Sequence, residues 1–386
     1  MGTQLLSIIM NHRQNMRTYR RFPVLVILLS LAFTWAYPPV SPDRFLMAAK
    51  KNTRKSRVHV KLKPVTGTRE ITIGEKTSVK IPVNYTIVQA GHSSYNGDDF
   101  VLNVFARDFT QGNAAYLEVL PHPGESLPRR LKLQAYFEGN DITLDTRAWG
   151  LRGIFAIPPD LNPGFATLEV KARGGRSDRV YRFPFRIGPT RFQTYRKGLN
   201  LGKYSDKDLF TRRPDLKARY ESEKKRKDEL FAKTGPDAMG NRLSHPRDHH
   251  RVTSAFYAKR IYDRYYNDHG KKIRTAPKTS FHLGLDLMGG IGSPIYALAD
   301  GVVAIAEEMY YEGNHTVIDH GAGIYSRYMH QSEILVRTGQ KVKAGELIGK
   351  VGDTGMVTGP HLHVGLIIRG IYVDPTSLLC LPVKSE

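Results

Sequence analysis

The sequence predicts an all-β protein in which two β domains are separated by a charged helical linker. Between residues 58 and 190, short runs alternate apolar and polar residues, and turn residues separate them. Residues 214–233 are charged, begin with Pro214 and end before Gly235-Pro236, which is typical of a solvated helix. From residue 252 onward, Gly-rich candidate strands follow one another without a long amphipathic helix, which favours a second, mainly antiparallel β domain.

The first 57 residues predict a targeting segment followed by a tether. Four arginines between residues 13 and 21 precede an apolar run over 22–37, and Ala36 suits a signal peptidase. The run is slightly shorter than the roughly 20 residues of a membrane span. We therefore expect residues 1–37 to be a signal peptide, or else an uncleaved membrane anchor. Residues 38–57 are Pro-rich and then basic and predict an exposed tether.

Three parts follow the tether. Residues 58–190 predict a β-sandwich of immunoglobulin-like type, because many short strands recur with turn residues between them. Residues 191–251 predict the charged helical linker, and residues 252–386 the second β domain. All residues with possible chemistry lie in this last part, so we expect it to fold and to act separately.

Composition restricts the partners and the metal chemistry. Lys and Arg number 58 against 36 Asp and Glu, a net charge of +22 that suggests an anionic partner. The predicted export argues against nucleic acid as that partner. Cys380 is the single cysteine, which excludes an intramolecular disulfide and a zinc site with several Cys ligands. Any metal must be held by carboxylates and by some of the 14 histidines.

Histidines and an aspartate recur in three short segments of the last domain. In a strand, His361 and His363 share one face, so their imidazoles can converge. His282 and Asp286 are four residues apart, and Gly284 between them allows the backbone to bend. A catalytic zinc needs three N or O ligands and an open position, and two His with one Asp meet that need. The remaining histidines would handle protons.

These residues resemble the lysostaphin-type, LytM-like zinc metallopeptidases, which cut peptide bonds in bacterial peptidoglycan. The resemblance covers residues 252–375, about a third of the chain. It rests on a series of motifs in order: His282-x-x-x-Asp286, Gly292-Ser293-Pro294, Asp300-Gly301-Val302-Val303, Asp319-His320-Gly321, Tyr328-Met329-His330, Gly352-x-Thr354-Gly355 and Gly359-Pro360-His361-Leu362-His363.

The resemblance implies a β-sheet domain of the duplicated hybrid motif type and a role for each histidine. Three residues are implied to hold one Zn²⁺: His282, Asp286 and His363. Two are implied to be catalytic, one as general base and the other at the oxyanion: His330 and His361. Two match no ligand position and are expected to be structural or surface residues: His315 and His320.

The sequence also departs from its relatives. Tyr257 stands where glycine is usual, within the segment Ser254 to Arg260. A basic, Tyr-rich insertion, Ile261 to Lys278, then precedes the first motif, and we expect it to lengthen a loop beside the substrate groove.

The combined prediction is an exported zinc metallo-endopeptidase of the periplasm or cell envelope. It would hydrolyse peptide bonds in peptidoglycan cross-links through a zinc-activated water. Its partners would be peptidoglycan stem peptides or cross-links and, through the N-terminal segment, a membrane. Two alternatives remain at this point: a non-catalytic envelope protein that activates a separate cell-wall amidase, and an adhesion or wall-binding protein with an incidental metal site. A D-alanyl–diaminopimelate bond and an oligoglycine bridge both remain open as the bond that is cut.

Overall fold

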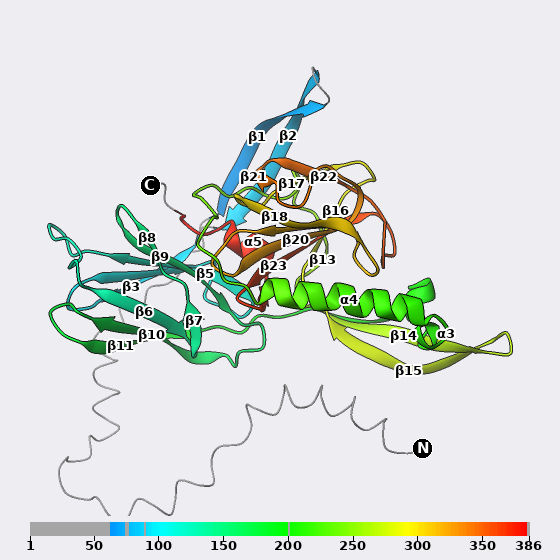
Figure 1. Cartoon of the computed structure of the whole chain (residues 1–386), viewed down its shortest axis with the longest axis horizontal. Coiled ribbons are helices and arrows are strands. Elements are labelled where there is room, and N and C mark those ends of the chain that lie inside the picture. The colour runs from blue at the N-terminus through cyan, green and yellow to red at the C-terminus, as the bar shows by residue number, and fades with distance from the viewer. Residues whose placement is uncertain (1–61, 74–76, 89, 200, 384–386) are drawn as a thin grey trace, which may run out of the picture. The chain divides into compact units, whose positions relative to one another are not determined.

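The computed structural model describes residues 62–73, 77–88, 90–199 and 201–383, and it consists mostly of antiparallel strands with few helices (Figure 1). The predicted signal peptide or anchor and the predicted tether lie outside the described residues. Within the described ranges, no helix combines the length and apolar content that crossing a membrane requires.

The first described strands form a separate ribbon. β1 (Leu62–Ile73) and β2 (Thr77–Val88) pair with each other in an antiparallel sheet of two strands. We expected this segment to belong to the β-sandwich, and the observed pairing corrects that boundary. The larger sheets of the N-terminal half begin at residue 91.

Two antiparallel sheets account for most of residues 91–187. The first has the order β3 (Gly91–Asn96), β4 (Val101–Ala106), β5 (Asn113–Leu120), β9 (Gly150–Ile157), β8 (Asp145–Arg147). The second has the order β11 (Arg179–Ile187), β10 (Gly164–Arg173), β6 (Lys132–Phe137), β7 (Asn140–Ile142). Alternation along β4 and β10 buries every second side chain. Both sheets contribute to one hydrophobic core, whereas the immunoglobulin-like type stays a prediction.

The segment between residues 191 and 251 is only partly helical. It contains β12 (Thr194–Leu199), the 3-10 turn η1 (Gly202–Ser205), α3 (Leu209–Arg212) and α4 (Pro214–Phe231). α4 begins at proline, whose fixed φ suits a first helical turn. We expected a solvated helix, but Glu223 and Lys227 on α4 are buried.

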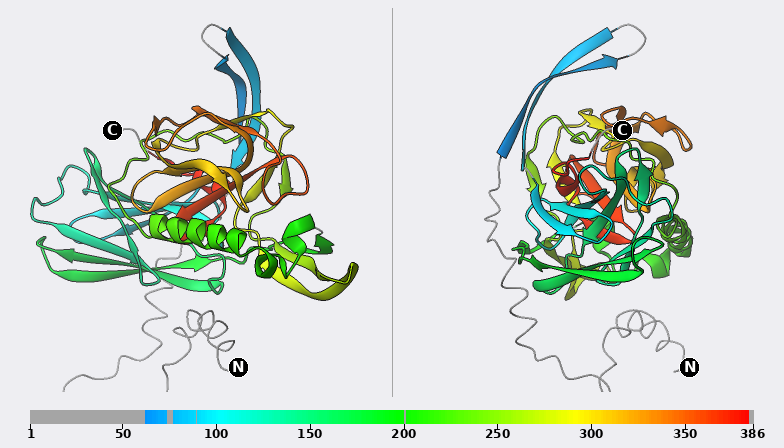
Figure 2. Two further views of the ribbon diagram at one scale, coloured as in Figure 1. Left: turned by 45° about the vertical axis from the view of Figure 1, so that its right-hand side comes forward. Right: turned by 90° about the vertical axis from the view of Figure 1, so that its left-hand side faces the viewer.

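A ten-stranded sheet forms the C-terminal part (Figure 2). Its main path is β13 (Val252–Ser254), β16 (Leu285–Met288), β23 (His361–Ile368), β20 (Ile324–Ile334), β19 (Gly313–Asp319), β18 (Gly301–Met309), β21 (Lys341–Val342). β17 (Pro294–Tyr296), β22 (Leu347–Val351) and β24 (Ile371–Val373) pair beside this path, and the short helix α5 (Pro375–Leu378) follows. β23 and the first eight residues of β20 are buried almost without interruption, polar side chains included, so both faces of these strands are covered.

The basic insertion is a β-hairpin and not a lengthened loop, which corrects the prediction. β14 (Lys259–Asp268) and β15 (Lys271–Phe281) pair antiparallel, and β12 pairs in parallel with β14. Alternating Tyr and basic residues suit a strand with one partly buried face. The hairpin ends one residue before His282, so it delivers that histidine to the sheet.

Residues 235–251 extend along the C-terminal sheet. Ala238 N–H donates to His320 O (2.8 Å), and Ser244 N–H donates to Leu298 O (2.8 Å). Met239 is fully buried in the C-terminal hydrophobic cluster. The same cluster includes Tyr116 of β5, so the core of the C-terminal sheet extends beyond residue 252 toward the N-terminus.

Candidate metal centre

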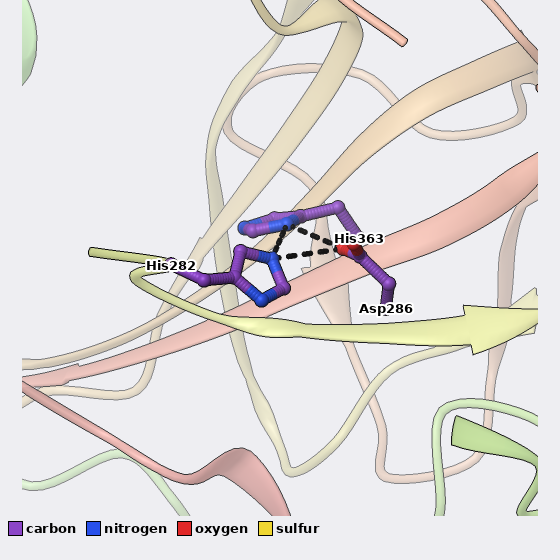
Figure 3. Close-up of side chains that lie close together, drawn as sticks. All are labelled: His282, Asp286 and His363. Carbon is purple, nitrogen blue, oxygen red and sulfur yellow. Dashed lines mark hydrogen bonds and ion pairs between the residues drawn. The ribbon is translucent and has the colours of Figure 1, made fainter. Parts of the chain in front are cut away.

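Three side chains converge at the edge between β16 and β23. Antiparallel pairing places Asp286 opposite His363, and His282 lies in the turn just before β16. His282 Nε2, His363 Nδ1 and Asp286 Oδ1 lie 2.9 Å from one another (Figure 3). All three residues are buried. The predicted metal ligands therefore form one cluster with a donor atom from each residue.

Burial and charge set the protonation of this cluster. Burial lowers the pKa of His363 to about 4, although Asp286 opposes the shift. Burial alone would raise the pKa of Asp286, but hydrogen bonds and charge from His282 and His363 hold it well below its ordinary value. At neutral pH the cluster therefore offers a neutral imidazole and a carboxylate, the protonation states that metal binding requires.

A backbone contact fixes the orientation of His282. Its Nδ1–H donates to the carbonyl oxygen of Ala255 (2.8 Å), and a carbonyl can only accept. In the neutral ring Nε2 therefore carries a lone pair, which faces Asp286 Oδ1 at 2.9 Å. Two acceptors at that distance repel unless a proton or a cation lies between them. The donor set, two imidazoles and one carboxylate, fits zinc.

Gly284 makes room for His363. A Cβ at this position would lie 2.4 Å from His363 Nε2 and 2.6 Å from the carbonyl oxygen of Val364. Real side chains do not approach so closely, so the ring could not keep its place beside a larger residue. The sequence suggested that Gly284 lets the backbone bend, and the structure adds that it admits the imidazole.

Arg260 orients the carboxylate, a role the sequence analysis did not assign. Its guanidinium donates to Asp286 Oδ2 (2.6 Å) and to Ser254 Oγ (2.8 Å). One oxygen of Asp286 is thus held by Arg260, and the other faces the imidazoles. Both Arg260 and Ser254 lie in the segment in which Tyr257 replaces the expected glycine.

Tyr257, which stands where the resemblance leads us to expect glycine, has a left-handed backbone with φ 56°. Glycine adopts this conformation without strain, whereas a tyrosine does not. Its ring stacks on Phe281 with centroids 4.5 Å apart, and its N–H donates to His282 O (2.7 Å). These contacts offset the strain and tie Tyr257 to the backbone of a cluster residue.

The two predicted catalytic histidines lie beside the cluster. The ring centroid of His330 is 5.1 Å from that of His361 and 6.0 Å from that of His363. His361 Nε2 lies 3.6 Å from Asp286 Oδ1, beyond hydrogen-bond distance. His330 Nδ1–H donates to Thr354 O (2.9 Å), and His361 Nδ1–H donates to Gly359 O (2.8 Å). In the neutral form, each ring keeps a lone pair on Nε2.

His315 and His320 lie outside the cluster. Both side chains are fully buried, and burial holds both pKa values below the ordinary value. His320 contacts Asp300 O (2.7 Å) and Ser326 Oγ (2.8 Å) through its two ring nitrogens. The contacts of His320 are those of a structural residue.

A mostly antiparallel β domain that gathers a His-Asp-His cluster and two further histidines has the construction of a metallohydrolase site. Residues 280–375 match the family model described as Peptidase family M23. This range contains all five predicted site residues. The predicted resemblance to LytM-like peptidoglycan endopeptidases is confirmed for this part of the chain.

Named relatives match the same part. Peptidoglycan DD-endopeptidase ShyA of Vibrio cholerae is 45% identical over 120 residues, which are 31% of this chain and 25% of ShyA. DD-carboxypeptidase/endopeptidase Mpg of Neisseria meningitidis is 36% identical over 119 residues, 31% of this chain and 27% of Mpg. The chain thus spans about a quarter of the length of these relatives.

Among solved structures, the catalytic domain of the antimicrobial peptidase lysostaphin from Staphylococcus simulans is 27% identical. The alignment covers 33% of this chain and 91% of that domain, with a TM-score of 0.27.

Proposed function

We propose that this protein is an exported zinc metallo-endopeptidase that hydrolyses peptide bonds in bacterial peptidoglycan cross-links. The observation that carries the proposal is the buried cluster of His282, Asp286 and His363, with donor atoms 2.9 Å apart, beside two histidines with fixed rings. The M23 match over residues 280–375 and the relatives named as peptidoglycan endopeptidases support it.

Each residue has a defined task in this mechanism. His282, Asp286 and His363 would hold the zinc, and Arg260 holds Asp286 in place. When bound, zinc supplies a Lewis acid for the scissile carbonyl and makes water a stronger acid. His330 and His361 are placed to move protons, because their Nδ1–H groups are tied to carbonyls and Nε2 is the free position.

The proton transfers follow from that ring orientation. Burial together with His363 and His361 lowers the pKa of His330 to about 3, so its ring is neutral at physiological pH and keeps the lone pair on Nε2. A ring that has accepted a proton on Nε2 becomes a donor there. One of the two histidines would accept a proton at Nε2 from the attacking water and then donate that proton to the leaving amine, and the other would stabilise the oxyanion once its own Nε2 is protonated.

The names of the relatives narrow the choice of the bond that is cut. ShyA is named a DD-endopeptidase, and Mpg a DD-carboxypeptidase/endopeptidase. We extend this to the present chain and propose a D-alanyl–diaminopimelate cross-link as the substrate. The net charge of +22 suits an envelope rich in anionic polymers. Export, a periplasmic or envelope location and membrane association through the N-terminal segment complete the proposal, together with an immunoglobulin-like sandwich before the peptidase domain.

Digestion of purified sacculi by the purified protein tests this function. Mass spectrometry of the released muropeptides should show cross-linked dimers converted to monomers that end in D-alanine. Zinc removal by a chelator should stop the conversion, and added Zn²⁺ should restore it. An unchanged muropeptide profile with zinc-loaded protein would contradict the endopeptidase. If a separate amidase became active only when the protein was added, the alternative role as an amidase activator would replace it.

A further inference from the structure

A cavity lies outside the side-chain cluster of the metal centre. Its volume is about 440 Å³, within the range of small-molecule and peptide subsites. Its wall combines the 3-10 turn η1, helices α3 and α4, the β14–β15 hairpin and the turn between β18 and β19. Most of these elements belong to the linker and the insertion.

Chain connections place this cavity next to the catalytic histidines. Ser280, on one wall, is two residues before His282. On the other wall, Met356 N–H donates to Tyr311 O (2.8 Å), and the loop of Met356 leads into His361. The residue after Tyr311, Glu312, accepts a hydrogen bond at its carbonyl from His330 N–H (2.9 Å). Both walls of the cavity are therefore connected by short chain segments to residues of the metal centre.

The floor of the cavity is aromatic. Tyr310 and Tyr311 pack at 4.8 Å between centroids, Tyr204 lies 5.4 Å from Tyr310, and Tyr220 lies 5.1 Å from Tyr311. Burial raises the pKa of each of these phenols, that of Tyr311 to about 12, so the rings stay uncharged at physiological pH. The hydroxyl of Tyr310, a residue 6% exposed, is buried without a hydrogen-bond partner among the described residues.

The rim of the cavity is cationic. Four cations line it, Lys203, Lys207, Arg264 and Lys278, against the carboxylates of Asp206 and Asp263. Arg212 pairs with Asp206 and so already neutralises that carboxylate. Within the described residues, Arg264 and Lys278 have no carboxylate partner. Unpaired cations over neutral aromatic rings favour a ligand with free carboxylates.

We propose that this cavity binds the carboxylate-bearing part of a peptidoglycan stem peptide next to the scissile bond, with Arg264 and Lys278 as its charged contacts. The proposal rests on the proposed function, because the occupant is a segment of that substrate. It assigns the insertion and the linker a role in substrate choice that is separate from the role of the metal centre.

Calorimetric titration of the full chain with two probes tests the cavity directly. The first probe is a stem tetrapeptide with free carboxylates and no cross-link, and the second is the same peptide with amidated carboxyl groups. The parent protein should bind the acid form about tenfold more tightly, the effect of one charge-assisted contact. In Arg264→Gln/Lys278→Gln this preference should disappear. The double variant Arg337→Gln/Lys341→Gln, which removes two exposed charges elsewhere, should keep it.

Three results decide the proposal. A preference retained by Arg264→Gln/Lys278→Gln, or lost equally in the control, would overturn the cavity as the carboxylate site. Tight binding of an uncharged glycan strand, with no effect of either double variant, would overturn it in favour of a sugar. Hydrolysis of sacculi is measured separately. If the parent protein hydrolyses sacculi but shows no preference for the acid peptide, only the proposal for the cavity is wrong. If it prefers the acid peptide but does not hydrolyse sacculi, only the proposed endopeptidase activity is wrong.

Discussion

At the scale of single residues, the metal centre depends on side chains with no ligand role. Ala255 O holds the ring of His282, Arg260 holds Asp286, and Gly284 leaves space for His363. Such outer contacts commonly change metal affinity by about 10- to 100-fold when they are lost. The motif order predicted that His282, Asp286 and His363 lie together, as they do in the structure. The supporting contacts could not be predicted, because they join segments that are distant in the sequence and meet only in the fold.

Gly284→Ala tests the space beside His363. The added methyl group would lie 2.4 Å from Nε2 of that ring, so the imidazole must move and zinc affinity should fall at least about tenfold. Competition with a chromophoric chelator measures the affinity. Gly290→Ala is the matched control, because a Cβ at Gly290 meets nothing within 4 Å. Equal affinities for the two variants would show that His363 does not need this space.

At the scale of elements, buried charged residues hold helix α4 in place beside the aromatic contacts of Tyr220 and Phe231. Lys227 of α4 and Arg327 of β20 both contact the carboxylate of Glu312, and all three are buried. Glu223 of α4 accepts from Tyr310 N–H (2.8 Å). The sequence of α4 predicted a solvated helix because several residues that contact the sheet are charged. Hydrophobic periodicity cannot detect such an interface.

The same limit of hydrophobic periodicity explains why the insertion was predicted to be a loop. Residues 261–278 alternate Tyr with Lys and Arg, a pattern that lacks the apolar residues of a typical core strand. They form β14 and β15 because backbone pairing and cation–π contacts, such as Lys272 over Tyr265 at 3.8 Å, replace a hydrophobic face. The sequence therefore predicted a loop where a hairpin lies. The C-terminal strands, which have regular apolar patterns, were predictable.

Glu312→Gln tests the charged interface and its pH dependence. Burial alone would raise the pKa of Glu312, but Lys227 and Arg327 hold it below its ordinary value. The stabilisation is therefore present above the unfolded-state pKa and is lost as the pH falls through the lower folded-state pKa. At pH 7 the variant leaves two buried cations unpaired, and we expect a loss of about 3 kcal/mol in the free energy of unfolding.

Urea unfolding of the parent and the variant from pH 7 to pH 3 measures this difference, which should shrink as the pH falls. Glu333→Gln serves as the control, because Glu333 forms an exposed pair with Lys350 (2.6 Å) and such pairs contribute about 0–1 kcal/mol. A difference between parent and Glu312→Gln that grows toward acid pH would contradict the account of the interface.

At the scale of the whole molecule, the C-terminal sheet packs against residues that precede residue 252. Residues 58–386 form one compact unit. Arg152 of β9 and Asp237 form a buried ion pair (2.8 Å), and Arg107 pairs with Asp374 (3.0 Å). The sequence placed all chemistry after residue 252 and predicted a separately folding domain there. Motif positions could not reveal these contacts, from which we predict that the domain is less stable without its N-terminal neighbours.

Truncation tests this integration. The fragment 252–386 lacks Met239, and loss of one large buried side chain costs about 2–5 kcal/mol. It also lacks the partner of Glu312 on α4. We expect it to be several kcal/mol less stable than 58–386 in urea unfolding, and a fragment 191–386 to be intermediate. If the fragments 252–386 and 58–386 were equally stable and hydrolysed sacculi equally well, residues 252–386 would be a separately folding and acting domain.

The central claim is that His282, Asp286 and His363 hold the zinc on which hydrolysis depends, while His361 acts without holding it. The zinc stoichiometry of purified variants, measured by mass spectrometry beside their hydrolysis rates, tests it most directly. His363→Ala should lose zinc, because two ligands remain. His361→Ala and His330→Ala should keep about one zinc per chain and lose about 10²- to 10⁴-fold in rate. Retention of zinc by His363→Ala together with its loss from His361→Ala would contradict the account.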